Sequence, residues 1–182
     1  MSRPKHRVHA AGAYFATAET WQRREIFKRE SAALIFVQTL MHYRNEGLFL
    51  LHDFVLMPDH FHIILTPGRG TTLEKALQLI KGGSSFRIGK ELRMKFPVWQ
   101  PGFHEHWIRD AQDYARCRIY LEQNPVKAGL LEMAEAFSFS SASGKYCLDP
   151  LAFASGAEAL DSRDAGSAGL KPRPANAAKD AK

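Results

Sequence analysis

The sequence contains little cysteine and no long apolar segment. Its two cysteines, Cys117 and Cys147, form no Cys-x-x-Cys motif, so we expect small core residues in a reducing compartment rather than a disulfide. No apolar run approaches the roughly 20 residues that span a bilayer. The basic N-terminus, from Met1 to Arg7, lacks the apolar stretch of a signal peptide. These absences predict a soluble, cytoplasmic protein.

Acidic residues are fewer than basic ones. With 25 Lys and Arg against 19 Asp and Glu, the net charge is +6, which favours an acidic partner, most simply nucleic acid. The 182 residues, 45% of them hydrophobic, suffice for one packed domain. We expect a basic arm at 1–10, the domain at 11–149, and a disordered tail at 150–182, because that tail is rich in Ala, Gly, Ser and Pro.

Periodicity and turn residues predict a succession of strands and helices. The expected strands are 12–17, 48–57, 60–65 and 103–108, and the expected helices lie at 31–46, 71–92 and 110–124. The strand at 48–57 is nearly continuous apolar, with only His52 and Asp53 interrupting it. Ser31 and Asp110 are the expected caps of the first and third helices. A capping box at Thr71 and Glu74 opens the second helix, and Gly82-Gly83 should break or loosen it. The first six elements match the α+β, ferredoxin-like split βαβ pattern, an antiparallel sheet with helices on one face, and a C-terminal helix follows.

Two His-x-His pairs occur on predicted strands. Alternate residues of a strand share a face, so His60 and His62 lie side by side, an arrangement suited to one metal ion. The alternative is two polar positions on a half-buried strand. His104 and His106 form a rival pair, but the ferredoxin-like order would place them on an edge strand and the first pair on a central, better shielded one.

The last predicted helix carries a tyrosine and an asparagine four residues apart. Tyr120 and Asn124 therefore share approximately one helix face. The Asn oxygen suits a hard ion such as Mg²⁺ or Mn²⁺, and an activated phenol can act as a nucleophile. The alternative for Tyr120 is an ordinary helical tyrosine with its hydroxyl in water.

Three sequence blocks resemble a known family. The blocks are Met57–Leu65 (MPDHFHIIL), Trp99–His106 (WQPGFHEH) and Tyr120–Leu130 (YLEQNPVKAGL). In this order and spacing they resemble the IS200-like transposases, and more closely the REP-associated tyrosine transposase branch. The resemblance runs from about residue 12 to about residue 141. One departure is Asp59, where the family usually has Asn, so metal preference stays open.

The resemblance implies a small HUH endonuclease that cleaves and rejoins single-stranded DNA. It assigns His60 and His62 to a Mg²⁺ or Mn²⁺ ion, Tyr120 to the nucleophilic attack that leaves a 5′-phosphotyrosine, and Asn124 to a third metal ligand. The expected substrate is a REP-like hairpin, and the protein would then be nucleoid-associated. The basic residues expected to contact DNA are Arg23, Arg24, Lys81, Arg87 and Lys127.

Three matters stay open at this level. The branch resembles monomers that act in cis, so we favour a monomer over a dimer. A non-catalytic protein that binds hairpin DNA is the first alternative function, and a metal-dependent RNA-processing enzyme on the same fold is the second. The role of His104 and His106 is also undecided between packing, DNA contact and support of the metal site.

Overall fold

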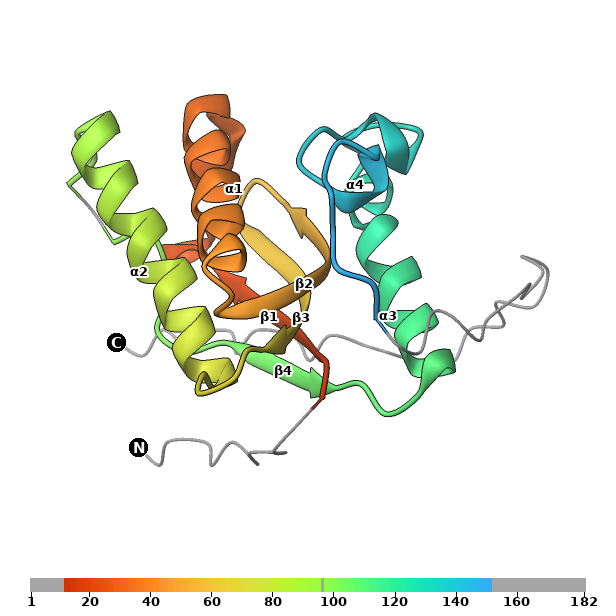
Figure 1. Cartoon of the computed structure of the whole chain (residues 1–182). Helices are drawn as coiled ribbons and strands as arrows, with labels where there is room; N and C mark the ends of the chain where they lie inside the picture. The colour runs from red at the N-terminus through yellow and green to blue at the C-terminus, as the bar shows by residue number, and fades with distance from the viewer. Residues whose placement is uncertain (1–11, 96, 152–182) are drawn as a thin grey trace, which may run out of the picture.

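The computed structural model describes residues 12–95 and 97–151. Its strands and helices follow the order β-α-β-β-α-β-α-α (Figure 1). The elements are β1 (Tyr14–Glu19), α1 (Glu30–Asn45), β2 (Phe49–Leu56), β3 (His60–Pro67), α2 (Leu73–Leu92), β4 (His104–Trp107), α3 (Ala111–Glu122) and α4 (Asn124–Lys127). Short 3₁₀ turns lie at Trp21–Arg23, Ile26–Lys28, Ala134–Ala136 and Ser141–Ser143.

The four strands form one antiparallel sheet in the order β2-β3-β1-β4. The first and third strands are thus central, and the fourth lies at an edge, as the ferredoxin-like pattern predicts. The mixed α+β fold is therefore confirmed. His60 and His62 lie on a central strand and His104 and His106 on an edge strand.

Both faces of the sheet are covered, each by its own hydrophobic cluster. Helices α1 and α2 lie on one face and α3 on the other (Figure 1). The alternation of β3 divides its side chains accordingly: Phe61, Ile63 and Leu65 join the α1–α2 cluster, whereas Ile64 joins the α3 cluster. His60 and His62 share the parity of Ile64, so they face the side covered by α3.

Local sequence signals explain the helix N-termini in part. Asp110 caps α3 as predicted, because its side chain accepts a hydrogen bond from the backbone N–H of Asp113 at 2.8 Å. The predicted capping box is displaced by one residue, since Thr72 rather than Thr71 caps α2. Ser31 was predicted as the cap of α1, but the helix already begins at Glu30 and its capping residue, Arg29, makes no side-chain bond.

The predicted break at Gly82-Gly83 is wrong, because α2 runs unbroken from Leu73 to Leu92. A reason appears at Gly83, where a Cβ would lie 2.6 Å from the hydroxyl oxygen of Tyr43 on α1. Glycine is therefore used there for close helix packing. A Cβ at Gly82 would meet nothing within 4 Å.

The segment after α4 lies along the outer edge of β2. The backbone N–H of Leu56 donates to the carbonyl of Phe139 at 2.9 Å, and that of Asp149 donates to Leu51 at 2.8 Å. The carboxylate of Asp149 also binds Arg44 and the N–H of Leu51. An edge that could pair with another strand is thereby covered.

Some predictions concern residues that the structure does not describe. The basic arm at 1–10 lies outside the described residues, as does the predicted tail apart from residues 150 and 151. Among the described residues, Cys117 is a buried core residue as expected, but Cys147 is exposed, which corrects the prediction of two core cysteines. No helix in this part of the chain is both long and apolar enough to cross a membrane.

Candidate active site on the α3 face of the sheet

The two histidines of β3 are close neighbours. Their ring centroids lie 4.8 Å apart, and the strand begins at His60 because Pro58 and Asp59 form the turn that precedes it. His62 is almost completely buried, with 5% of its surface exposed. Burial, together with the nearby His60 and Arg23, lowers the pKa of His62 to about 3. Its imidazole is therefore neutral, which is the form that binds metals.

The two imidazoles contact the protein through the same ring atom. The Nδ1 atom of His62 lies 2.6 Å from Thr17 Oγ1, and that of His60 lies 2.7 Å from a carboxylate oxygen of Asp59. The Nε2 atom of His62 is buried and has no hydrogen-bond partner in the described structure. A buried nitrogen without a partner costs free energy, so a bound cation is a fitting partner for it.

Tyr120 of α3 lies directly against this pair. Its ring centroid is 5.3 Å from that of His62 and 5.9 Å from that of Phe15, which stacks on His62. The phenol is half-buried, so a ligand in solvent can reach it. The structure thus brings together His60, His62 and Tyr120, three residues that the sequence singled out from segments 58 positions apart.

Asn124 and Lys127 lie in α4, which directly follows α3, the helix that carries Tyr120. The carboxamide nitrogen of Asn124 donates to the Tyr120 carbonyl at 3.5 Å, a bond that does not use the oxygen expected to bind metal. The ammonium nitrogen of Lys127 lies 5.6 Å from the centroid of the Tyr120 ring, within cation–π range. Both residues therefore border the tyrosine.

The other predicted DNA-contacting residues are divided between the two faces. Arg23 lies next to the histidine pair, since its Nε is 2.8 Å from the Asp59 carboxylate. Arg24 is exposed nearby and bonds to the Gln22 side chain. Lys81 and Arg87 belong to α2, on the opposite face of the sheet from Tyr120 (Figure 1). There Lys81 donates to two backbone carbonyls, and Arg87 bonds to Gln38, Thr39 and Glu91.

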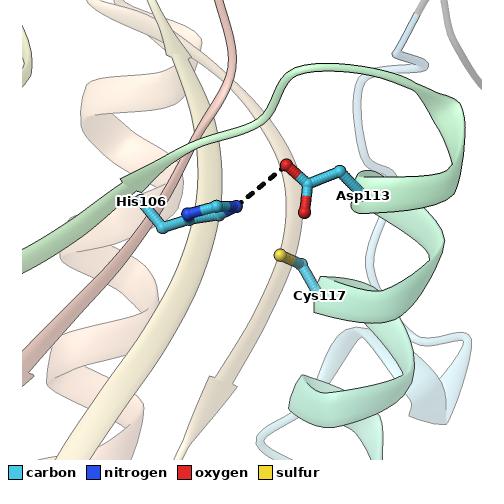
Figure 2. Close-up of side chains that lie close together, drawn as sticks. All are labelled: His106, Asp113 and Cys117. Atoms are coloured by element: carbon cyan, nitrogen blue, oxygen red, sulfur yellow. Dashed lines mark hydrogen bonds and ion pairs between the residues drawn. The ribbon is translucent and has the colours of Figure 1, made fainter. Parts of the chain in front are cut away.

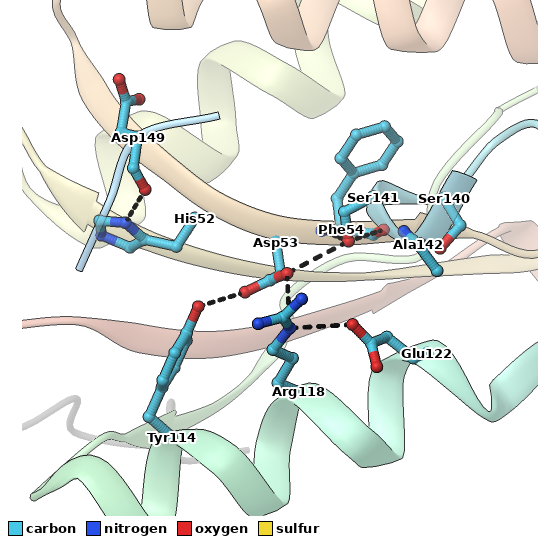
Figure 3. A network of polar contacts seen from close by, with 10 residues as sticks. All are labelled: His52, Asp53, Phe54, Tyr114, Arg118, Glu122, Ser140, Ser141, Ala142 and Asp149. Atoms are coloured by element: carbon cyan, nitrogen blue, oxygen red, sulfur yellow. Dashed lines mark hydrogen bonds and ion pairs between the residues drawn. The ribbon is translucent and has the colours of Figure 1, made fainter. Parts of the chain in front are cut away.

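A buried carboxylate that sequence analysis treated only as an interruption of β2 connects α3 to the sheet. Figure 3 shows Asp53 between Tyr114 and Arg118 of α3 and Ser141. The Tyr114 hydroxyl donates to Asp53 at 2.6 Å, Ser141 donates at 3.3 Å, and the Arg118 guanidinium lies at 3.6 Å. Burial raises the pKa of Asp53, and the bond from Tyr114 and the charge of Arg118 oppose that rise. A β-bulge between Leu51 and Asp53 turns this carboxylate toward α3.

A second connection joins the first turn of α3 to β4. His106 donates from Nε2 to Asp113 at 2.9 Å, and Cys117 lies beside them (Figure 2). The three ligand atoms lie within 4.8 Å of one another, close enough for a metal ion. However, Asp113 also accepts bonds from the backbone and side chain of Arg109 and from Arg116, and burial raises the pKa of the Cys117 thiol to about 11. These features favour a structural anchor over a metal site.

Comparison with known proteins identifies the family of the chain. The family model described as "Transposase IS200 like" matches residues 13–124, more than half of the chain. The chain therefore belongs to the IS200-like transposase family.

Its relatives narrow the assignment to a branch. An Escherichia coli protein named "REP-associated tyrosine transposase" is 25% identical over 155 residues, which cover 75% of this chain and 87% of that protein. A Haemophilus influenzae relative, provisionally given the same name, is 28% identical over 116 residues, and the match spans 58% of this chain and 64% of that protein. These names agree with the branch expected from the three sequence blocks.

A solved structure supports the fold. It is described as the REP-associated tyrosine transposase bound to a REP hairpin, and it superposes with a TM-score of 0.66 at 24% identity. The superposition covers 94% of this chain and all of that one. The expected ferredoxin-like architecture is thus shared with a solved structure.

Proposed function

We propose that this chain is a metal-dependent tyrosine transposase that cleaves and rejoins single-stranded, REP-like hairpin DNA through a 5′-phosphotyrosine intermediate. The family and the names of its relatives support the class of substrate. One observation carries the chemistry: the Tyr120 ring lies 5.3 Å from that of His62, whose buried Nε2 has no protein partner. The proposed nucleophile thus lies next to a buried ring nitrogen to which no described residue bonds.

His60, His62 and Asn124 are the residues that would hold a Mg²⁺ or Mn²⁺ ion. When bound, such an ion supplies positive charge beside the scissile phosphate. The Tyr120 oxygen attacks phosphorus and loses its proton. The bond from phosphorus to the 3′-oxygen breaks, and that oxygen gains a proton. Attack by a 3′-hydroxyl on the phosphotyrosine reverses the reaction, and because one phosphodiester replaces another, no ATP is needed.

The surroundings of Tyr120 suit a DNA backbone. Lys127 lies over the tyrosine ring, and Arg23 is connected to His60 through Asp59, so each part of the candidate site has a cation near it. Phosphate attraction to such residues supplies much of the affinity for single strands, and it weakens with salt. We propose that Lys127 and Arg23 contact the strand next to the cleaved phosphate, whereas Lys81 and Arg87, on the other face, contact DNA only if it wraps around the molecule.

We also propose that the chain acts in cis, as a monomer. Tyr120 and the histidines of the same chain are in ring contact, so one chain contains the whole candidate site. Only residues 108–110 connect β4 to α3, and the His106–Asp113 bond joins the two ends of this connection. An exchange of α3 with another chain would have to open that connection.

The proposal is tested with a labelled single-stranded hairpin from the DNA that flanks the gene. The oligonucleotide is incubated with Mg²⁺ or Mn²⁺ and resolved on a denaturing gel, with Tyr120→Phe alongside. We expect a protein–DNA adduct that requires metal and is absent from the variant. Tight binding without an adduct from both proteins would instead indicate a non-catalytic hairpin-binding protein. Metal-dependent RNA cleavage retained by Tyr120→Phe would indicate an RNA-processing enzyme.

A further inference from the structure

We infer that Thr17 and Asp59 are positioning residues for the metal site: each holds one histidine through Nδ1, so that both imidazoles present Nε2 to a divalent cation. This inference rests on the proposed function, because it takes His60 and His62 as the metal ligands. It adds two residues, on β1 and in the β2–β3 turn, which set the ring orientation of those ligands.

Thr17 is fixed opposite His62 by the pairing of β1 with β3. The two residues are direct partners in the antiparallel register, and their side chains point to the same face. The Oγ1–Nδ1 distance of 2.6 Å is that of a hydrogen bond. When Nδ1 carries the proton and donates to Thr17, the lone pair of His62 lies on Nε2, the buried atom without a partner. Thr17 thus holds the ring in place and can accept from Nδ1 in the tautomer that a cation requires.

Asp59 holds His60 in the same way but with a charged acceptor. Its carboxylate lies 2.7 Å from Nδ1 of His60 and is only partly exposed, at 19% of the side chain. The other oxygen is 2.8 Å from Arg23, so the carboxylate is itself held in place. A carboxylate on Nδ1 fixes the ring and makes the opposite nitrogen a stronger ligand. The resulting chain runs from Arg23 through Asp59 to His60.

A third histidine shows what a purely structural arrangement looks like in this sheet. His52, at the bulge of β2, is as buried as His62 and also bonds to a threonine, with Nε2 2.9 Å from Thr66 Oγ1. Its Nδ1 is bonded as well, to the Asp149 carbonyl at 2.8 Å. Both nitrogens of His52 are thus used by the protein. His62 resembles it in burial and in its threonine partner, but its Nε2 is left for a ligand.

The test measures Mn²⁺ binding to the metal-free protein by titration, followed by calorimetry or by the electron paramagnetic resonance signal of free Mn²⁺. Thr17→Val removes the hydroxyl at nearly constant shape, and we expect affinity to fall about 10- to 100-fold, the usual cost of losing such a partner. Thr17→Ser keeps the hydroxyl and should bind like the wild type. Thr66→Val removes the equivalent bond to His52 and serves as the matched control, with affinity unchanged.

Asp59 is tested with a second pair of variants. Asp59→Ala removes the acceptor and should weaken Mn²⁺ binding, whereas Asp59→Asn keeps an acceptor oxygen and should retain most of the affinity. Equal affinities for the wild type, Thr17→Val and Asp59→Ala would overturn the inference while leaving the proposed metal site intact. Equal losses in Thr17→Val and Thr66→Val would also overturn it, since the effect would then be one of general stability. A wild-type protein that binds no Mn²⁺ would refute the metal site and the inference together.

Discussion

Replacing Tyr114 with phenylalanine tests whether the Asp53 carboxylate anchors the tyrosine-bearing helix. The hydroxyl donates to Asp53 at 2.6 Å, and the carboxylate is 3% exposed. A hydrogen bond to a charged group contributes about 1.5–3 kcal/mol, and its loss here leaves the carboxylate with weaker partners, Ser141 at 3.3 Å and Arg118 at 3.6 Å. We expect Tyr114→Phe to lower the free energy of unfolding by about 2–3 kcal/mol at pH 8.

The same variant has a predictable pH dependence. Burial raises the pKa of Asp53 above its ordinary value, and the Tyr114 hydroxyl bond opposes the rise, so Tyr114→Phe raises this pKa further. As the pH falls, Asp53 is protonated first in the folded variant, which relieves the uncompensated charge. The destabilisation caused by Tyr114→Phe should therefore shrink between pH 8 and pH 5.

The assay is urea unfolding of the metal-free protein at both pH values. Tyr146→Phe is the matched control, because that hydroxyl donates at 2.8 Å to a neutral acceptor, the Ser138 carbonyl. We expect the control to cost about 0.5–1.5 kcal/mol at either pH. A Tyr114→Phe penalty that equals the control, or that grows toward pH 5, would refute the idea that a buried ionised Asp53 holds α3.

Two further predictions concern helix packing and DNA binding. Gly82→Ala should stabilise α2 by about 0.5–1 kcal/mol, because its Cβ would meet nothing within 4 Å. Gly83→Ala should instead destabilise the protein by about 1–3 kcal/mol, because its Cβ would lie 2.6 Å from the Tyr43 oxygen. Thermal unfolding of both variants measures the two shifts, and equal shifts would contradict the prediction. Lys127→Met should reduce the slope of log affinity against log salt by about 0.7 for a single-stranded hairpin flank, and Lys127→Arg should keep it. Fluorescence anisotropy at several salt concentrations measures that slope, and an unchanged slope in Lys127→Met would remove Lys127 from the DNA contact.

The parts of the fold that sequence analysis predicted well are those governed by local rules. The turn at Pro58-Asp59 and the two-residue period of β3 were enough to place His60 and His62 on one face, because alternate side chains of a strand point to the same side. Asp110 was found as a helix cap by an equally local rule, since its side chain accepts from an N–H three residues away.

The parts that were missed depend on contacts between distant segments. Gly83 looked like a helix breaker because the sequence does not show that Tyr43 of another helix packs against it. Asp53 looked like a polar interruption because the bulge that turns it toward α3 has no sequence signature here. The Thr17–His62 bond requires the register of β1 against β3, which involves residues 45 positions apart.

The two His-x-His pairs show why residue type and spacing alone could not separate a metal site from an anchor. Both pairs follow the same spacing, and the register places His62 and His104 on either side of Thr17 in the sheet. What distinguishes them is the ring nitrogen that the protein uses. His62 bonds through Nδ1, and its buried Nε2 has no hydrogen-bond partner among the described residues. In the second pair, His106 donates from Nε2 to Asp113, and His104, on the edge strand, is exposed. The preference for the first pair rested on shielding by a central strand, and the hydrogen bonds add a chemical reason for it. The first pair keeps a buried ring nitrogen to which no described residue bonds, as the proposed metal site requires, whereas the second pair contributes a bond that holds α3 in place.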